Sequence, residues 1–174
     1  MLTNLARQST VKMQITISKA RIEDAPILTH IAVTAKRHWN YPEQYYEIWK
    51  DELTIAPEYI KRNTCFMASR QDVIMGFYSI AENPDDFYSG DVLVKKGFWL
   101  EHIFVLPEYH GKGTGTHLIG HAKEFCKTSG IDKLMIFVDP MAEGFYKKSG
   151  AIYSYTSKSS IPDRQIPVYE LQVT

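Results

Sequence analysis

The residues best suited to chemistry in this sequence form a glycine-rich turn, His110-Gly111-Lys112-Gly113-Thr114-Gly115. An apolar run, Gly97–Val105, precedes the turn and predicts a central strand, and a helical period follows it to about residue 129. Backbone N–H groups at the start of a helix lack helical partners and carry positive potential, and glycine lets an anion approach them closely. The turn therefore suits phosphate, although an isolated turn of this composition also fits an ordinary loop.

Two familiar phosphate motifs do not fit this turn. A Walker loop needs Gly-Lys followed by Ser or Thr, whereas Lys112 is followed by Gly113. A dinucleotide-binding fold needs an early Gly-x-Gly-x-x-Gly in a parallel strand-helix-strand unit. Here the turn lies two thirds of the way along the chain, after strands that we expect to be antiparallel. Neither of these nucleotide-binding classes is indicated.

The stretch 100–115 resembles the GCN5-related N-acetyltransferase (GNAT) family, whose signature there is Gln or Arg, two residues, Gly, one residue, then Gly or Ala. Gly113 and Gly115 match the signature, and His110 stands at its first position. A second stretch, 142–151, is similar to the family's A-x-x-F-Y-x-K-x-G-F segment. The order of the expected elements agrees with the family over about residues 14–173. Two spaced motifs in the right order are more specific than either alone.

The resemblance implies acetyl-CoA or coenzyme A as a co-substrate, and no metal. Its contacts are expected at the end of the central strand, in the glycine turn and near the short helix after Asp139, which stands where the family often has Asn. The expected cofactor-binding residues are Ile103, Phe104, Val105, His110, Gly111, Lys112, Gly113, Thr114, Gly115, Thr116, Asp139, Phe145, Tyr146 and Lys148.

The implied activity is transfer of an acetyl group from acetyl-CoA to a primary amine of a small molecule or peptide, by direct attack in a ternary complex. Such attack needs a neutral amine, a stabilised oxyanion and a proton for the departing thiolate. The resemblance makes Glu101 the base and Tyr146 the acid. A structural ion pair for Glu101 and aromatic packing for Tyr146 are the alternatives. Strand alternation predicts that His102 points to the opposite face from Glu101.

The acceptor amine is expected beside an aromatic patch at the junction of the first two helices. Aromatic faces attract cationic amines, although a helical stripe of this kind is more often core. The residues expected to bind the acceptor are Trp39, Tyr41, Tyr45, Tyr78 and Glu101. A polyamine, an amino acid, an aminoglycoside-like molecule and a peptide terminus all remain open. His117 and His121 lie one helical turn apart without an evident acidic third ligand, so no metal site is predicted.

Composition excludes several partner classes. Lys plus Arg and Asp plus Glu both total 20 in 174 residues, so no overall positive field favours nucleic acid or an anionic membrane surface. The apolar stretches are shorter than the roughly 20 residues that span a bilayer. Cys65 and Cys126 are too few for a disulfide framework, so we expect reduced thiols in a cytoplasmic protein. The resemblance leaves a homodimer open.

The segment 1–12 carries two positive charges without a following apolar run, so it reads as a flexible arm and not as a secretory signal. Translation could also begin at Met13. Residues 13–174 are expected to form a single acyl-CoA N-acyltransferase domain.

The expected fold class is α+β (mixed α/β), with a GNAT-like central sheet that is mixed, mostly antiparallel, of about six to seven strands and flanked by helices on both faces. Helices are expected at 24–38, with Asp24 as N-cap, at 42–53 and at 57–62. Strands at 64–69 and 73–81 form a hairpin, and the polar segment 82–96 is expected as a surface loop. A strand at 133–138, a helix at 141–148, and strands at 151–156 and 168–173 complete the chain.

Two other functions fit the same motifs. The chain could be a binding module that holds coenzyme A as a sensor or structural ligand without turnover. It could also bind phosphate or nucleotides unrelated to coenzyme A, in which case ATP would stabilise it as much as coenzyme A does.

Overall fold

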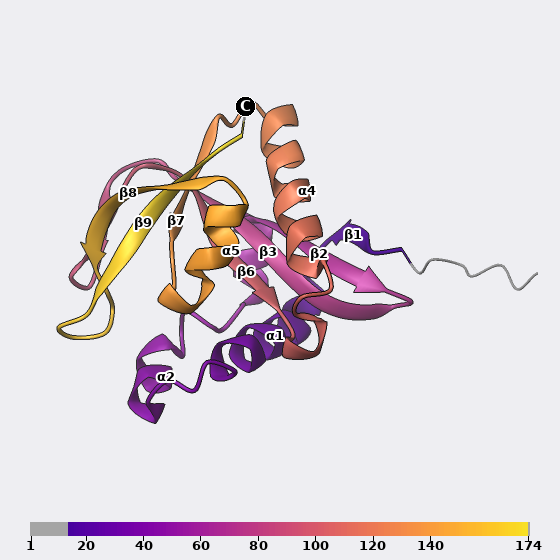
Figure 1. The fold of residues 1–174 in the computed structure, drawn as a ribbon, viewed down its shortest axis with the longest axis horizontal. Helices are drawn as coiled ribbons and strands as arrows, with labels where there is room; N and C mark the ends of the chain where they lie inside the picture. The colour runs from indigo at the N-terminus through magenta and orange to yellow at the C-terminus, as the bar shows by residue number, and fades with distance from the viewer. Residues whose placement is uncertain (1–13, 174) are drawn as a thin grey trace, which may run out of the picture.

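A seven-stranded mixed sheet forms the centre of the computed structural model, which describes residues 14–173 (Figure 1). The strand order is β1-β2-β3-β6-β7-β9-β8, and within the described residues β6 and β7 are the only parallel neighbours. The expected arm 1–12 and the alternative start at Met13 lie outside the described residues. The strands are β1 (Thr16–Lys19), β2 (Thr64–Arg70), β3 (Val73–Asn83), β6 (Gly97–Val105), β7 (Lys133–Phe137), β8 (Ala151–Lys158) and β9 (Gln165–Gln172).

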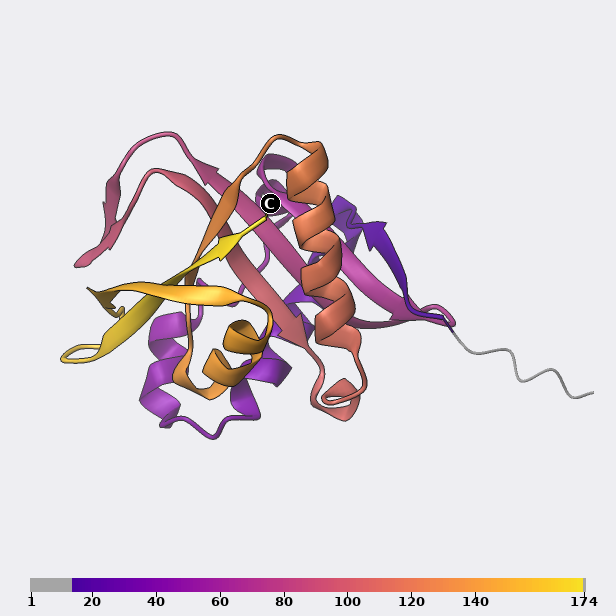
Figure 2. The same ribbon diagram turned by 45° about the horizontal axis from the view of Figure 1, so that its top comes forward.

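Helices cover both faces of the sheet, as Figures 1 and 2 show. One face is packed against the three helices of the first third of the chain, and the other against the two later helices. This arrangement confirms the predicted fold class. The helices are α1 (Ala25–Arg37), α2 (Glu43–Trp49), α3 (Pro57–Arg62), α4 (Thr114–Thr128) and α5 (Glu143–Lys148).

The helix ends differ in detail from the sequence-based expectation. Asp24 stands at the N-cap position of α1, but its carboxylate accepts the backbone N–H of Arg21 at 2.7 Å instead of a helical N–H. The second helix was expected to continue to residue 53 and ends at Trp49. Residues 50–53 form a turn instead, in which Leu53 is buried and its N–H bonds to Trp49 O at 2.9 Å, while residues 50–52 are exposed.

The expected surface loop at 82–96 contains a second, two-stranded sheet. β3 continues to Asn83, and β4 (Phe87–Ser89) pairs antiparallel with β5 (Val92–Val94) across a turn in which Gly90 has φ of 58°. The loop prediction is therefore wrong for this part of the segment. Its aromatic and β-branched residues favour strand pairing, although polar residues dominate the segment as a whole. We call this hairpin the β4–β5 arm, and Figure 2 shows it projecting beyond the main sheet.

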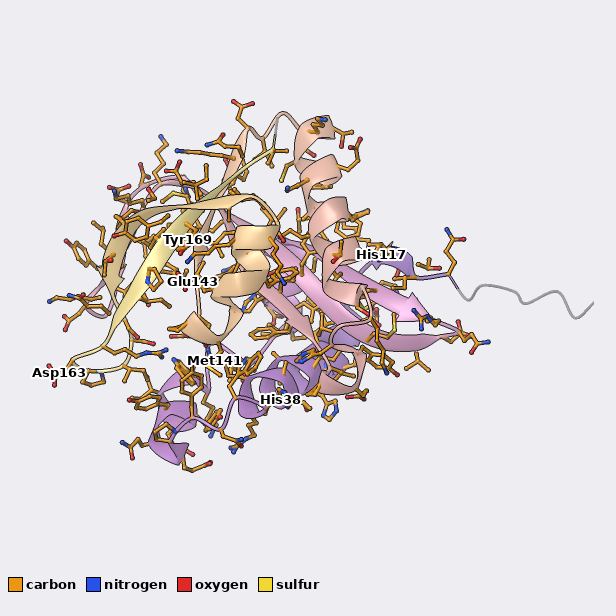
Figure 3. The ribbon with its side chains drawn as sticks, viewed as in Figure 1. His38, His117, Met141, Glu143, Asp163 and Tyr169 are labelled. Atoms are coloured by element: carbon orange, nitrogen blue, oxygen red, sulfur yellow. The ribbon has the colours of Figure 1, made fainter. Side chains whose placement is uncertain are left out.

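The core lies in two layers, one on each face of the sheet. Phe77 and Tyr78 are neighbours on β3, both fully buried, and they point to opposite faces because side chains alternate along a strand. Phe77 packs with the α1–α3 layer, and Tyr78 packs with the α4 layer. On the α4 side, α5 is tied to β9 by a hydrogen bond that the Tyr169 hydroxyl donates to Glu143, a pair labelled in Figure 3.

β3 lies close to β6 at Gly76, which is opposite Val105. A Cβ added at Gly76 would lie 2.5 Å from the backbone oxygen of Phe104 and 3.1 Å from the Cα of Val105. Both obstacles are backbone atoms, which cannot turn aside as a side chain can. Gly76 therefore sets how closely β3 approaches the end of β6 that carries the candidate site.

We expect Gly76→Ala to lower the free energy of unfolding by about 2 kcal/mol, because the added methyl group forces the two strands apart. For a chain of this length that corresponds to a fall in Tm of roughly 4–8 °C. Gly120→Ala is the matched control. Gly120 is exposed on α4 with no atom within 4 Å of the added Cβ, so the change should raise the stability by roughly 0.5–1 kcal/mol. Equal melting temperatures for Gly76→Ala and wild type would contradict the close pairing.

Candidate active site

The candidate site lies where two central strands separate. β6 pairs with β3 from Gly97 to Val105, but its parallel pairing with β7 is recorded at a single position, Trp99 opposite Met135. Beyond that point the edge of β6 that faces β7 has no partner strand within residues 14–173. The end of this edge is partly satisfied by His110, whose Nε2 donates to the Val105 carbonyl at 2.9 Å.

A cavity of about 450 Å³ opens at this separation. It brings together predicted residues from the central strand and from the segment after β7, and it adds residues that sequence reasoning missed. The predicted residues at its wall are Glu101, Ile103, Phe104, Asp139 and Tyr146. The main additions are Trp49, Glu52, Tyr59, His102 and Arg164.

A β-bulge decides how Glu101 is presented. Ser79 of β3 pairs with His102, and the next residue, Ile80, pairs with Leu100, so Glu101 is an extra residue in β6. Alternation breaks at such a residue. Glu101 and His102 therefore both line the cavity, and the expectation that His102 points away is wrong. The departure from strict alternation in β6 comes from this one extra residue, which can be recognised only from the pairing register of β6 with β3.

Tyr59 of α3 joins these two side chains. Its hydroxyl donates to Glu101 Oε2, lies 2.8 Å from Ser79 Oγ and lies 3.2 Å from His102 Nδ1. Burial raises the pKa of Tyr59, and the negative charge of Glu101 raises it further, so the phenol keeps its proton. Burial lowers the pKa of His102, against the opposing charge of Glu101, which favours the neutral imidazole.

Glu52 is a second carboxylate at the cavity, in the turn after α2. Desolvation by the surrounding protein raises its pKa and the charge of Glu101 adds to this, whereas a hydrogen bond from Ser160 and the charge of Lys36 oppose it. Two carboxylates from different elements thus face the same space. Their negative charge favours a cationic amine, and the positive charges of Lys36 and Arg164 at the same cavity oppose this effect.

Tyr146 reaches the cavity from α5, on the far side from Tyr59. Its side chain is 7% exposed, and among the described residues no hydrogen-bond partner holds its hydroxyl. Burial raises its pKa above that of an ordinary phenol, and the charge of Asp139 adds to the effect. At neutral pH Tyr146 therefore presents a protonated, unengaged hydroxyl to the cavity.

The glycine turn lies just beyond the end of β6 and begins α4. Gly111 and Gly113 have φ of 68° and 85°, in the left-handed region that favours glycine, and Gly113 is the N-cap. His117 N–H is bonded to Gly113 O, so the N–H groups of residues 114–116 precede the first helical bond. Thr114 Oγ1 is buried without a partner at the same place. The residues present therefore fit a phosphate group.

The Phe145 ring packs against the glycine turn at Gly115. A Cβ added at Gly115 would lie 3.1 Å from Phe145 Cε2, so the glycine allows the ring to pack on the first turn of α4. Lys112 in the turn, Lys148 at the end of α5 and Thr116 on α4 are exposed. The predicted cofactor residues of the turn and of α5 thus lie on adjoining elements.

All four predicted acceptor aromatics lie outside the cavity wall. Trp39 stacks on His110, with ring centroids 6.0 Å apart, beside the glycine turn. Tyr45 packs against Trp49 at 5.5 Å. Tyr78 is fully buried on the α4 face, where its hydroxyl lies 2.9 Å from His121 Nδ1. The structure therefore does not bring Tyr78 to the acceptor, because the pleat of β3 turns it to the opposite face.

Asp139 braces the cavity at the end of β7. Its Oδ2 pairs with Lys36 Nζ at 2.5 Å, and its Oδ1 accepts from the Tyr41 hydroxyl at 2.6 Å and from Met141 N–H at 3.0 Å. Burial by itself raises the pKa of Asp139, but the charge of Lys36 and these hydrogen bonds lower it below its usual range. Tyr41 thus contacts Asp139, which lines the cavity. Both carboxylate oxygens of Asp139 already have partners within the protein.

The two histidines of α4 have other partners. His117 Nδ1 donates to Gly113 O at 2.8 Å, and His121 packs on Phe66 with ring centroids 4.6 Å apart. Figure 3 labels His117 on α4 and His38 near the end of α1. Across residues 14–173 no group of three or more His, Cys, Asp or Glu side chains could hold a metal ion. In the same part of the chain, every helix is too short or too polar to cross a membrane.

Comparisons with known proteins agree with this geometry. The Acetyltransferase (GNAT) family matches residues 31–151. The chain is similar to the structure of a GCN5-related N-acetyltransferase from Rhodopseudomonas palustris, with 21% identity, a TM-score of 0.71, and 90% of this chain and 94% of that chain covered. It is also similar to the PaiA N-acetyltransferase of Thermoplasma acidophilum in complex with coenzyme A, with 21% identity, a TM-score of 0.69, and 92% and 99% covered.

A third similar structure is the ribosomal-protein-S18-alanine N-acetyltransferase of Escherichia coli, with 18% identity, a TM-score of 0.61, and 92% of this chain and 95% of that chain covered. No curated protein matches the sequence. The split sheet with a glycine turn at the head of the next helix, together with these likenesses, defines a GNAT fold. Because the family match spans well over half of the chain, the protein belongs to the acetyltransferase (GNAT) family.

Asp139→Asn should destabilise the protein at pH 7 by about 3 kcal/mol, because it leaves the largely buried Lys36 without its charged partner. The pKa of Asp139 is lowered in the folded state, so its stabilisation is complete above its unfolded value of about 3.9. The stabilisation is lost as the pH falls through the folded-state value. Urea unfolding of both proteins at falling pH should therefore show the gap narrowing below about pH 4.

Glu43→Gln is the matched control for this pair. The Arg37–Glu43 pair has side chains that are 49% and 69% exposed, so solvent screens it and its loss should change the stability little at any pH. A constant difference between Asp139→Asn and wild type down to about pH 2 would contradict an ionised Asp139 as the source of the effect.

Proposed function

We propose that the protein is an acetyl-CoA-dependent N-acetyltransferase that acetylates a primary amine of a small molecule or peptide in a ternary complex. The observation that carries this proposal is the convergence of the Glu101 carboxylate and the Tyr146 hydroxyl on the cavity between β6 and β7. The phosphate-binding turn stands at the end of the same strand β6. A similar protein, the PaiA N-acetyltransferase, was solved in complex with coenzyme A, which supports the choice of acyl donor.

The cofactor is proposed to run from the glycine turn into the cavity. The N–H groups of residues 111–116, with Lys112 and Lys148 nearby, would bind its phosphates. The open edge of β6 at residues 103–105 would bind the pantetheine amides, because that edge has no partner strand. His110, which bonds to Val105, and Phe145, which packs on Gly115, hold this edge and the turn in place. The thioester supplies the acetyl group.

The reaction needs one base and one acid. Glu101 takes a proton from the amine, directly or through a water, while the amine nitrogen forms a bond to the thioester carbonyl carbon. Tyr146 donates its phenolic hydrogen to the sulfur as the C–S bond breaks. Its raised pKa keeps the hydroxyl protonated until negative charge develops on that sulfur.

The acceptor is proposed to occupy the part of the cavity bounded by Trp49, Glu52 and Tyr59, with Tyr41 and Asp139 at its edge. A volume of about 450 Å³ suits a small molecule or the end of a peptide. Tyr45 supports this region by packing on Trp49, whereas Trp39 packs on His110 beside the glycine turn. A single acyltransferase domain at 13–174, a cytoplasmic location and a homodimer remain predictions.

Acetyl-CoA and coenzyme A should raise the Tm of the protein, whereas ATP should not do so to the same extent. A ligand at 100 times its Kd stabilises the folded state by about 2.7 kcal/mol, which is roughly 5–10 °C for a chain of this size. Gly113→Ala should reduce the shift, because a side chain at φ of 85° strains the turn that presents the N–H groups. No shift at millimolar acetyl-CoA would contradict the proposal, and an equal shift with ATP would indicate a general phosphate site.

Tyr146→Phe and Glu101→Gln should each lower kcat for release of free coenzyme A thiol by about 100-fold, since each removes one proton-transfer group. The KM for acetyl-CoA should stay near the wild-type value, because neither side chain lies in the phosphate-binding turn. Thiol release against a panel of amines measures both constants and also identifies the acceptor. Stabilisation by coenzyme A without thiol release from any amine would instead identify a non-catalytic coenzyme A-binding module.

A further inference from the structure

A chain of hydrogen-bonding side chains leads from the cavity into the protein behind Glu101. The Tyr59 hydroxyl contacts Glu101 Oε2 and lies 2.8 Å from Ser79 Oγ, and Ser79 Oγ lies 2.8 Å from His102 Nδ1. The four residues come from α3, β3 and β6. Ser79 is fully buried, so its hydroxyl can be satisfied only by these neighbours.

His102, at the far end of this chain, has a defined tautomer. His102 Nε2 lies 3.1 Å from the backbone carbonyl of Glu52, and a carbonyl can only accept, so Nε2 carries a hydrogen. Burial lowers the pKa of His102, which favours the neutral ring. In a neutral imidazole with Nε2–H, Nδ1 has no hydrogen and accepts. His102 therefore terminates the chain as an acceptor.

When Glu101 is ionised, this chain of side chains has one hydrogen too few for its contacts. Three short contacts run in sequence from Glu101 through Tyr59 and Ser79 to His102, beside a longer contact of 3.2 Å between the Tyr59 hydroxyl and His102 Nδ1. The two hydroxyl groups supply only two hydrogens for the three short contacts. One contact must therefore go without a hydrogen. If Glu101 gains a proton, its O–H donates to Tyr59, Tyr59 donates to Ser79, and Ser79 donates to His102 Nδ1. All three hydrogen bonds are then made.

We propose that Tyr59, Ser79 and His102 form a relay that stabilises Glu101 while it holds the proton taken from the attacking amine. This inference rests on the proposed acetyltransferase function. In the step, an amine N–H bond breaks, an O–H bond forms on Glu101, and the nitrogen electron pair forms the new C–N bond. The relay hydroxyls reorient without any net gain of protons, and the exposed Glu101 later returns its proton to solvent.

Tyr59 is a positioning residue in this scheme because it acts through Glu101. Its bond to Oε2 also orients the carboxylate, which leaves Oε1 to face the amine. The neighbouring acid Glu52, the thiol Cys65 and the imidazole His102 are the other titratable groups whose charges couple to Glu101. Among the described residues none of them hydrogen-bonds to the Glu101 carboxylate, so Tyr59 is its direct partner.

The kinetic test uses Tyr59→Phe, which keeps the buried ring and removes the hydroxyl. We expect kcat to fall about tenfold or more at saturating acetyl-CoA, with the KM for acetyl-CoA within about twofold of wild type. Tyr78→Phe is the matched control, because it removes another buried hydroxyl that contacts a histidine, His121, but on the opposite face of the sheet. It should leave kcat unchanged. A Tyr59→Phe enzyme with wild-type kcat would overturn the relay while leaving the acetyltransferase intact.

A rescue series separates the relay from simple packing. In His102→Gln the side-chain oxygen can accept from Ser79 and the amide can donate to the Glu52 carbonyl, so both contacts have a replacement. His102→Leu offers neither contact. We expect the Gln variant to keep at least about tenfold more kcat than the Leu variant, with folding of each checked by its Tm. Equal kcat values in two folded variants would overturn the relay.

A second measurement does not depend on turnover. Long-range ¹H–¹⁵N spectra of the histidine rings should show His102 as the neutral Nε2–H tautomer at pH 7, with a hydrogen-bonded Nδ1. In Ser79→Ala the Nδ1 signal should move toward the value of an unbonded nitrogen. A wild-type ring with hydrogen on Nδ1, or no change in Ser79→Ala, would overturn the relay. If wild type released no thiol with any amine, the proposed function would fail, and these spectra would still decide the direction of the chain.

Discussion

The separation of β6 from β7 is the constraint on which the candidate site depends. If the two parallel strands stayed paired beyond Trp99 and Met135, the edge of β6 at residues 103–105 would bond to β7, and the space between the strands would close. Two groups of contacts hold the strands apart. His110 bonds to the end of β6 at Val105, and Asp139 ties the end of β7 to Lys36 and Tyr41 in the first part of the chain.

The same separation lets opposite faces of the sheet contribute to one cavity. Tyr59 arrives from the α1–α3 layer, whereas Tyr146 belongs to the core layer on the α4 side. Glu101 stands between them because the bulge in β6 adds one residue to the strand. The charged groups around this space are mixed, since Glu52 and Glu101 line it together with Lys36 and Arg164. Most of the aromatic side chains between residues 39 and 49 pack on one another, and through Trp49 they support the cavity wall.

The parts of this arrangement that could be predicted from sequence are those with a local signal. The bounds of β6 and α3 follow from an apolar run and from a Pro-initiated helical period, and the glycine turn and the Phe145-Tyr146 pair carry recognisable spacing. The rest depends on contacts between distant segments. Tyr59 lies 42 residues before Glu101 with no motif around it, and the placement of His102 depends on register. Tyr78 was predicted to bind the acceptor because it is aromatic, but residue type alone does not reveal which face of a strand a side chain occupies.

The β4–β5 arm has a consequence for how such a protein can change over generations. Its two strands pair with each other and with no strand of the main sheet, so residues can be inserted or deleted there without moving any register in the sheet. Yet Phe87 and Val94 of this arm reach the cavity wall. The end of the cavity near the arm is therefore open to variation at little cost to the register of the sheet, whereas the glycine turn contains Gly111 and Gly113, whose positive φ disfavours other residues. The part of the wall that the arm supplies can diversify while the glycine turn stays constant.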